Sequence, residues 1–545
     1  MKFSHQIVSP MCKVFPDGST LEELNPRRLT GLRGETLSFQ IAYRWEEWGR
    51  SWGSVQVGSP LRVRVRTVEL VPCRYPCHTT RDPGYLATQP GLYPDLLREL
   101  SPLGFPLVSG QWRSLWVDVE LEEDQEPGEY PVRIRLETQG ELLCQAELSC
   151  GVTGLSLPRL PIPHTEWFHS DCLANYYQTE VFSQRYWEIV EEFVRTAVRR
   201  KCNMLLTPVF TPPLDTAVGG ERLTVQLVDV EASEGSYRFG FEKFRRWVKM
   251  ALDCGMEYFE ISHLFSQWGA IAVPKILAWK EGEFRQIFGW DTDAGGEEYR
   301  EFLRQFLRAL KKELEALGIQ EKTYFHISDE PSMAQIGSYR RAWEAVREEL
   351  EGYAMMDALS DYGFYREGLV QQPVCALDHI EPFLENPPER LWGYYCTSQC
   401  VDVPNRFIVL PGSRTRILGV LLYKYRLSGF LHWGYNFYNS QNSLYPINPY
   451  ETTDAGEAFP SGDPFLVYPG KDGKPEESQR LMLMDQAMSD YCALTALEKL
   501  AGRERVLELI GENVTFREYP QAESYLLSLR ERVNQAITEA LRSQS

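Results

Sequence analysis

The sequence predicts an α/β protein: a (β/α)8 TIM barrel preceded by an N-terminal antiparallel β-sandwich domain. Segments near the N-terminus alternate apolar and polar residues with period two, which is typical of strands with one buried face. A proline-rich segment follows, and after it short apolar runs alternate with amphipathic helices. At 545 residues the chain is too long for one ordinary core, so at least two domains are expected.

The N-terminal β-sandwich is expected over residues 1–156. Strict alternation appears in residues 61–66, 115–121 and 130–136, and residues 126–129 contain a Pro-Gly turn signal between the last two segments. Alternating strands with Pro/Gly punctuation and no long helical period indicate an antiparallel sandwich.

A stiff linker is expected at residues 157–163, because three prolines within six residues cannot continue a central strand or a helix. The barrel and its C-terminal helices are then expected over residues 164–545. The predicted barrel strands are residues 165–169, 203–210, 258–265, 323–328, 354–359, 374–377, 391–396 and 429–433. The predicted helices include residues 185–200, 241–254, 298–317, 336–351 and 414–427. Strands that alternate with helices in this way are typical of a (β/α)8 barrel.

Composition excludes several classes of partner. The formal charge of −19 disfavours nucleic acids and anionic membranes, both of which require a basic surface. The N-terminus has no long apolar segment, and no stretch near eighteen apolar residues occurs, so we expect a cytoplasmic protein with no membrane span.

The twelve cysteines are expected to be reduced, buried thiols rather than metal ligands. The pairs Cys73/Cys77 and Cys396/Cys400 have a spacing that zinc sites allow, but His78 is the only histidine near either pair. No metal and no cofactor is therefore expected.

The strand at residues 323–328 ends in Asp329-Glu330-Pro331, and this pair of carboxylates is the main candidate site. The same tripeptide is also an ordinary helix start, and a helical pattern follows it. The preceding helix ends at Gly318, which makes this the fourth strand of the barrel. Its C-terminal end then lies on the barrel face that carries active sites, which favours a catalytic role for Asp329 and Glu330.

Two adjacent carboxylates suit one particular form of glycoside hydrolysis. In a conventional retaining glycosidase the two carboxyl groups lie about 5 Å apart and usually come from different strands. Adjacent carboxylates suit the substrate-assisted exception, in which the 2-acetamido group of the sugar attacks C1 and forms an oxazolinium ion. Asp329 would then orient the acetamido N–H, and Glu330 would protonate the leaving oxygen and later activate water.

Other predicted strand ends carry aromatic and polar groups that suit a sugar, because rings stack on the apolar face of a pyranose. Each residue alone has core packing as its commoner role, and His263 or His326 is more often a satisfied core histidine than a metal ligand. Their convergence on one barrel face predicts a substrate-binding set. The set is Trp167, His263, Asp361, Tyr395, Trp433 and Asn436.

From about residue 167 to residue 497 the chain resembles glycoside hydrolase family 123 and the wider set known as domain of unknown function 4091. The segments that carry the resemblance are residues 203–215, Ser328-Asp329-Glu330-Pro331, residues 391–396, residues 429–436, Tyr468-Pro469-Gly470 and residues 478–481, which lead to Asp490-Tyr491. One departure is Met484-Asp485-Gln486, where the family pattern has Arg-Asp-Gly.

The resemblance implies a β-sandwich followed by a catalytic barrel, and retaining exo-β-N-acetylgalactosaminidase activity on terminal β-GalNAc. It assigns to Asp329 and Glu330 the roles given above. The expected partner is a glycan that ends in a 2-acetamido sugar. The alternatives are a glycosidase for another such sugar, for example β-GlcNAc, and a non-catalytic carbohydrate-binding barrel protein.

Overall fold

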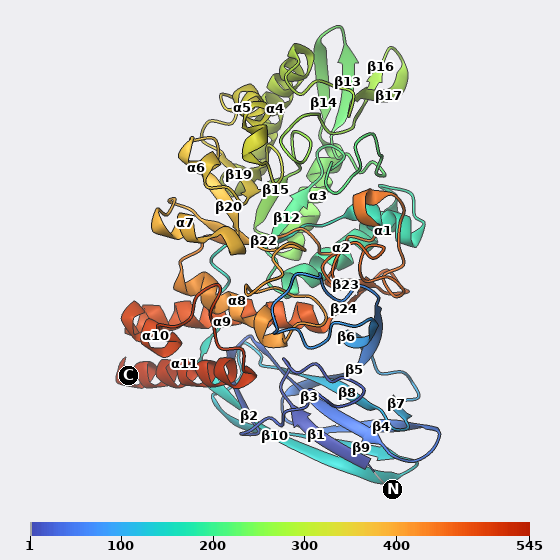
Figure 1. Ribbon diagram of the computed structural model, residues 1–545, viewed down its shortest axis with the longest axis vertical. Helices are drawn as coiled ribbons and strands as arrows, with labels where there is room; N and C mark the ends of the chain where they lie inside the picture. Colours follow the sequence, from blue (N-terminus) through green and yellow to red (C-terminus); the bar gives the residue numbers. More distant parts are fainter. Residues whose placement is uncertain (1–2, 545) are drawn as a thin grey trace.

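A computed structural model describes residues 3–544, and the chain begins with two five-stranded sheets packed face to face (Figure 1). The first sheet has the order β1 (Phe3–Val8), β3 (Thr36–Trp45), β8 (Trp112–Glu120), β5 (Arg62–Cys73) and β6 (Gly91–Glu99). The second has the order β2 (Arg28–Arg33), β10 (Glu141–Ser156), β9 (Gly128–Thr138), β4 (Arg50–Gly58) and β7 (Phe105–Val108). The predicted N-terminal sandwich is confirmed.

Strand β8 shows why the first sheet is buried on both faces. Leu115 and Val117 point into the core between the two sheets, where Ile134 of the second sheet meets them. Trp116, on the opposite face, packs against Met482 of a helix in the barrel domain. The outer face of the sheet is therefore a docking surface for the rest of the chain.

The predicted barrel is also confirmed as a closed ring of parallel strands, with the last strand paired to the first. The strands are β11 (His164–Glu166), β12 (Met204–Thr207), β15 (Tyr258–Ile261), β18 (Thr323–Phe325), β19 (Ala354–Leu359), β20 (Gln372–Ala376), β21 (Trp392–Tyr394) and β22 (Gly429–His432). Most are shorter than the predicted apolar runs, because the C-terminal residues of those runs leave the sheet and form the mouth of the barrel.

Helices separate the strands and surround the barrel. They are α1 (Ser170–Tyr177), α2 (Gln184–Arg199), α3 (Glu242–Cys254), α4 (Glu297–Leu317), α5 (Ile336–Val346), α6 (Gly363–Arg366), α7 (Glu381–Glu385), α8 (Gly412–Lys424) and α9 (Gln479–Ala501), followed by α10 (Arg503–Ile510) and α11 (Glu523–Gln544). No helix within residues 3–544 combines the length and apolar character that a membrane-spanning segment needs.

Two small sheets were not predicted from the sequence. The loops after β12 and β15 together form a four-stranded sheet of β14 (Ser236–Gly240), β13 (Asp229–Ser233), β16 (Ile276–Lys280) and β17 (Glu283–Phe288). β23 (Val467–Pro469) and β24 (Pro475–Glu477) form a hairpin before α9.

Buried ion pairs join the sandwich to the barrel domain. Arg480 of α9 donates through Nε and Nη2 to the two carboxylate oxygens of Asp95 on β6, both at 2.8 Å. Arg66 of β5 donates to Asp118 and to Glu477, each at 2.6 Å. Charges buried in this way are stable only with such partners, so the two domains are fixed relative to each other.

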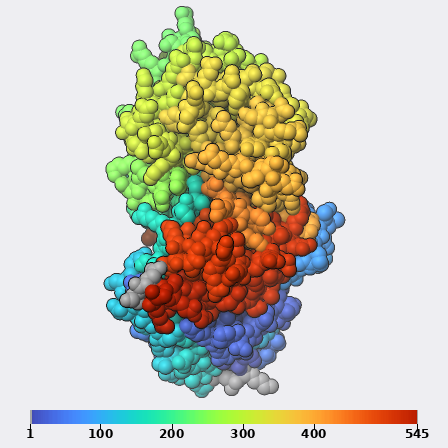
Figure 2. Space-filling view, turned by 90° about the vertical axis from the view of Figure 1, so that its left-hand side faces the viewer, coloured from blue at the N-terminus to red at the C-terminus, as the bar shows by residue number. Residues whose placement is uncertain are grey.

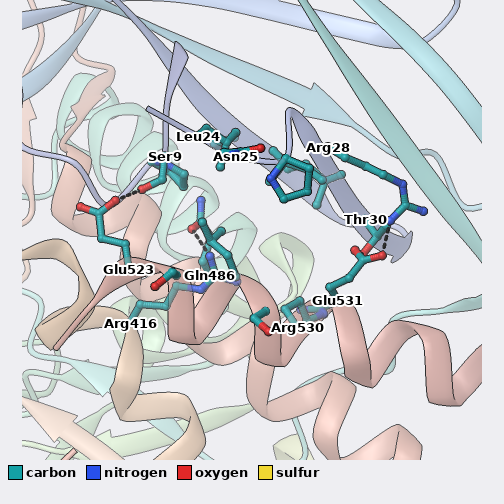
Figure 3. Close-up of a pocket in the computed structure, with 18 of the residues that line it drawn as sticks. Ser9, Leu24, Asn25, Arg28, Thr30, Arg416, Gln486, Glu523, Arg530 and Glu531 are labelled. Atoms are coloured by element: carbon teal, nitrogen blue, oxygen red, sulfur yellow. Dashed lines mark hydrogen bonds and ion pairs between the residues drawn. The ribbon is translucent and has the colours of Figure 1, made fainter. Parts of the chain in front are cut away.

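The C-terminal helices cover the seam between the domains, as Figure 2 shows. A cavity of about 370 Å³ lies between α11 and the sandwich. Figure 3 shows residues that line it. Ser9 bonds Glu523 at one end of it, and Thr30 donates to Glu531 at 2.7 Å at the other. Helix α11 therefore packs against the N-terminal domain although it is the last element of the chain.

Replacing Arg480 with Ala should strongly destabilise the protein. Both Arg480 and Asp95 are fully buried, and breaking such a pair leaves an uncompensated charge at a cost of about 3–5 kcal/mol. The midpoint of urea unfolding should fall accordingly. As a control, Arg505→Ala removes one partner of an exposed pair with Glu508 and should cost less than about 1 kcal/mol. Equal midpoints for the two variants would contradict this account.

Candidate active site

Asp329 and Glu330 lie in the loop after β18, separated from the end of the strand by residues 326–328, and line one cavity of about 170 Å³ at the C-terminal mouth of the barrel. This volume lies below the roughly 300–1,000 Å³ typical of pockets for drug-sized ligands, and it suits a single sugar ring rather than a chain. The other lining residues are Trp167, Leu214, Asp215, Gln267, Trp268, Ala358, Tyr394, Cys396, Thr397, Leu431, Trp433, Gln441, Asn442 and Phe459.

The backbone at Glu330 explains how two successive side chains reach one cavity. Neighbouring residues of a regular strand point to opposite faces. Here the strand has ended, and Glu330 has a φ of 41°, in the left-handed region. Its N–H donates to the carbonyl of Ala358 at 3.0 Å, while the carbonyl of Asp329 accepts from the N–H of Trp268 at 2.8 Å. Strained backbone of this kind is concentrated at functional sites.

Glu330 has the environment of a general acid. Burial raises the pKa of its carboxyl group, and the negative charge of Asp378 raises it further. Tyr394 Oη donates to Glu330 Oε1 at 2.7 Å, and Cys396 Sγ lies 3.9 Å from the same oxygen; both contacts act to lower this pKa. The net pKa is raised, which is the condition for holding a proton near neutrality.

The ionisation of Asp329 depends on the charge of Glu330. Burial raises the pKa of Asp329, the neighbouring Glu330 charge raises it further, and the charge of His326 opposes both. Because two adjacent buried carboxylates do not ionise together easily, the two groups titrate together as a pair.

A buried imidazolium, that of His326, favours the ionised form of Asp329 by its positive charge. His326 Nε2 donates to Glu260 Oε1 at 2.5 Å, and Nδ1 donates to Asp357 Oδ1 at 3.2 Å. Burial lowers the pKa of His326, but the bonds to Asp357 and Glu260 outweigh it and raise the pKa to about 10. His326 is therefore positively charged at neutral pH. Glu260 Oε1 also accepts from Trp167 Nε1 at 2.6 Å, which orients that ring at the cavity wall.

His263, expected to bind substrate, lies beneath the cavity wall and does not line it. Its ring stacks on His326 with centroids 4.3 Å apart and touches Trp167 edge-on at 5.1 Å. Among the described residues neither of its ring nitrogens has a hydrogen-bond partner. Burial, followed by the charge of His326, holds its pKa well below the usual value, so His263 is neutral.

The polar atoms of His263, His326 and Asp357 lie within 4.8 Å of one another, which raises the question of a metal. The arrangement does not suit one. The two imidazole planes are within 17° of parallel, so their in-plane lone pairs do not converge on a common point. Both nitrogens of His326 are already bonded to carboxylates. The cluster therefore holds a protonated His326 instead of a metal ion.

Trp167 and Trp433, both expected to bind substrate, line the cavity. Trp433 follows β22, and its Nε1 donates to Asp463 Oδ2 at 2.9 Å. Its ring packs edge-on against Phe437 and Phe459, with centroids 4.9 and 5.4 Å away. The indole is thus fixed by a hydrogen bond and by packing.

Three other residues of the expected binding set lie outside the cavity. Tyr395 points away from it, with Oη 3.3 Å from Met484 Sδ of α9, because side chains alternate along the strand and Tyr394 takes the inward position. Asn436 accepts from the N–H of His169 at 2.8 Å and donates to its carbonyl at 3.1 Å, which fixes the start of α1. Asp361 accepts from the N–H of Gly363 at 2.8 Å in the turn before α6.

Asp215 is a third carboxylate of the cavity, and the sequence analysis did not place it in the site. Asn442 N–H donates to Asp215 Oδ2 at 3.0 Å, and the N–H of Asp215 donates to Gln267 Oε1 at 2.7 Å. Burial raises its pKa to about 6, against the lowering effects of the Asn442 bond and the Arg222 charge. Its only sequence signal was its position at the end of residues 203–215.

Trp268 and Asn442 were also missed. Trp268 is 42% exposed and has a φ of 57° in an irregular loop after β15. Asn442, at a φ of 57°, lies in the long loop after β22. Neither loop has a periodic pattern, so only the folded chain brings these residues to the mouth.

Known proteins resemble this chain in sequence and in fold. Residues 167–497 match the model of the glycoside hydrolase 123 catalytic domain. No curated protein matches the chain. A family 123 glycoside hydrolase from Clostridium perfringens, studied for glycolipid glycan hydrolysis, is 16% identical with a TM-score of 0.75, over 100% of this chain and 99% of its own. At that identity the likeness shows the fold alone.

Two further structural matches are too weak to support any conclusion about this protein. A Bacteroides ovatus GH5 xyloglucanase is 10% identical over 85% of this chain and 98% of its own, with a TM-score of 0.30. A candidate glycoside hydrolase from Bacteroides vulgatus is 9% identical over 81% of this chain and 76% of its own, also with a TM-score of 0.30. The family model, by contrast, spans more than half of the chain and confirms the resemblance seen in the sequence: the protein is a glycoside hydrolase and belongs to family 123.

Proposed function

We propose that the protein is a retaining exo-β-N-acetylgalactosaminidase that removes terminal β-GalNAc by substrate-assisted catalysis. The observation that carries this proposal is the pair of adjacent carboxylates in one small cavity, with a tyrosine hydroxyl on Glu330 and an imidazolium near Asp329. A pair with such perturbed pKa values disfavours a non-catalytic binding protein.

In this proposal the terminal sugar occupies the cavity with its apolar face against the indole rings of Trp167 and Trp433. The carboxylate of Asp215 accepts hydrogen bonds from sugar hydroxyls. The 2-acetamido N–H donates to Asp329, which favours the ionised form of Asp329 and leaves the proton of the pair on Glu330. The charge of His326 supports the same distribution.

The reaction then has two steps. The acetamido oxygen attacks C1, the glycosidic bond breaks, and Glu330 gives its proton to the leaving oxygen. The resulting oxazolinium ion is positively charged and is stabilised by Asp329. Water next attacks C1 while the Glu330 carboxylate takes its proton, which opens the ring and regenerates the acetamido group. Two inversions at C1 give net retention.

The substrates we propose are glycans with a terminal β-GalNAc, among them the glycan portion of glycolipids. The Clostridium perfringens structure was studied for glycolipid glycan hydrolysis. The small volume of the cavity supports cleavage of one terminal residue at a time.

Replacing the two carboxylates should separate their roles. Glu330→Gln should lose about 10²–10⁴-fold in kcat on poor leaving groups, and far less on an activated aryl glycoside that needs little protonation. Asp329→Asn should be impaired on both substrates, because formation of the ring is then unsupported. Glu283→Gln, at an exposed position of β17, is the control and should behave as wild type. Equal losses for Glu330→Gln on both kinds of leaving group would contradict its role as acid.

The substrate itself tests the mechanism. 4-Nitrophenyl β-GalNAc should be hydrolysed and the matching β-galactoside should not, because only the former carries the acetamido nucleophile. A GalNAc-derived thiazoline should inhibit, since it resembles the cyclised intermediate. Efficient hydrolysis of the β-galactoside, or a glycosyl ester trapped on either carboxylate, would overturn substrate assistance. Preference for β-GlcNAc would keep the mechanism and change the sugar.

Two variants should move the alkaline limb of the pH–rate profile in opposite directions. Glu330 acts in its protonated form, so activity falls as pH rises through its raised pKa. Tyr394→Phe removes a bond that lowers this pKa, and the limb should move to higher pH. Asp378→Asn removes a charge that raises it, and the limb should move to lower pH.

Tyr395→Phe is the matched control, because it removes a neighbouring hydroxyl that faces Met484. Its profile should match that of wild type. Movement of the limb in the same direction for Tyr394→Phe and Asp378→Asn would refute the assignment of that limb to Glu330.

A further inference from the structure

We infer that a second cavity beside the catalytic one, of about 650 Å³, binds the first sugar of the leaving group. The inference rests on the proposed function. The cavity is formed by all three parts of the chain: the N-terminal domain, the barrel loops and the C-terminal segment. Its principal lining residues are Tyr75, His78, Thr79, Asp378, Ser398 and Arg517.

The second cavity lies on the same face of the barrel as Glu330. Asp378 comes just after β20 and Ser398 comes just after β21, so both belong to the C-terminal mouth. Thr397 lines the catalytic cavity, and the next residue, Ser398, lines the second one. A single loop after β21 therefore separates the two cavities.

A histidine of the N-terminal domain secures that loop. His78 Nε2 lies 3.0 Å from the carbonyl oxygen of Thr397 and 3.1 Å from its Oγ1. Tyr75 Oη lies 2.8 Å from His78 Nδ1 and fixes the ring from the other side. Both residues come from the loop between β5 and β6, so the sandwich domain contributes directly to the surroundings of the site.

The position of Glu330 gives the direction in which the leaving group departs. The proton donor must face the leaving oxygen, and the contacts of Glu330 are Tyr394 and Cys396 at the end of β21. Asp378, after β20, is close enough for its charge to act on Glu330. The leaving group should therefore extend over the ends of β20 and β21, where the second cavity lies.

Three other loops supply part of the wall of the catalytic cavity. Asp215 comes from the loop after β12, Trp268 from the loop after β15, and Asn442 from the loop after β22. Asp215 is hydrogen-bonded to Gln267, the residue before Trp268, and to Asn442, so these three loops are joined to one another. This wall encloses the terminal sugar, and the rest of the glycan extends on the side of Glu330.

The lining of the second cavity fits a hydroxylated, uncharged ring better than an acyl chain. Thr79 and Ser398 present exposed hydroxyl groups, and Tyr75 is a partly exposed aromatic ring. Asp378 and Arg517 supply one charge of each sign, which disfavours a strongly charged ligand. Polar groups around one aromatic ring are the usual composition of a sugar site.

The acidic group of this cavity is already oriented. Gln399 Nε2 donates to Asp378 Oδ1 at 3.0 Å, and Gln399 Oε1 accepts from the N–H of Cys396 at 2.9 Å. Gln399 thus links the Asp378 carboxylate to Cys396, whose Sγ lies 3.9 Å from Glu330 Oε1.

The test compares kcat/KM for GalNAc β-linked to galactose with kcat/KM for 4-nitrophenyl β-GalNAc. Thr79→Trp fills the second cavity from an exposed position, and Tyr75→Ala removes its aromatic ring. In both variants the disaccharide-to-aryl ratio should fall about tenfold, equivalent to about 1.4 kcal/mol. Thr88→Ala, an exposed threonine of the same loop that does not line the cavity, is the control and should keep the wild-type ratio.

An unchanged ratio in a folded Thr79→Trp protein would overturn the inference. The inhibition constant of the GalNAc thiazoline should be unaffected by Thr79→Trp, because that compound occupies only the catalytic cavity. A parallel rise of this constant with an unchanged ratio would also count against the second cavity. Failure of the wild-type protein on both substrates would refute the proposed function instead, so the two failures are distinguishable.

Discussion

The candidate site depends on one buried interaction, the ion pairs of His326 with Glu260 and Asp357. The three residues come from β15, the end of β18 and β19, so the interaction joins three neighbouring parts of the barrel. The two carboxylates keep the imidazole protonated although burial opposes it. Without that charge, burial and the negative charges of Glu330, Asp357 and Glu260 would all raise the pKa of Asp329, and its ionised form would be costly.

Each carboxylate of this cluster has a second task. Glu260 also accepts from Thr165 and Trp167, which sets the ring of Trp167 at the cavity wall. Asp357 also accepts from the backbone N–H groups of Ile327 and Ser328, the two residues before Asp329. The carboxylates that keep His326 protonated therefore also position Trp167 at the cavity wall and the start of the turn that carries Asp329 and Glu330. Because each carboxylate accepts several hydrogen bonds, the fully buried charged cluster is stable here.

Buried ion pairs also fix the sandwich domain against the barrel domain. The Arg480–Asp95 pair fixes the sandwich against α9, and the Arg66–Glu477 pair fixes it against β24. Once the sandwich is fixed, the loop that carries Tyr75 and His78 reaches Thr397 at the edge of the catalytic cavity. The sandwich is thus structurally continuous with the mouth of the barrel, and a role in choosing the leaving group follows from that position.

The sequence by itself determined the architecture and the two carboxylates. Period-two alternation and the strand–helix rhythm depend only on local burial, and they predicted the sandwich, the eight strands and the placement of Asp329-Glu330 after the fourth strand. Trp167 and Trp433 could be selected because each directly follows a strand. The direction of a side chain beyond a strand end is not local information, so Tyr395 was expected in the position that Tyr394 occupies.

Only the tertiary structure decided which irregular segments complete the mouth. Asp215, Trp268 and Asn442 lie in loops with no periodic pattern, and their backbones adopt left-handed conformations that long-range contacts impose. The charge of His326 and the burial of His263 likewise depend on partners from distant strands. Composition and periodicity record whether a residue is buried, but they do not record which distant group faces it, and that pairing sets both the pKa values and the shape of the site.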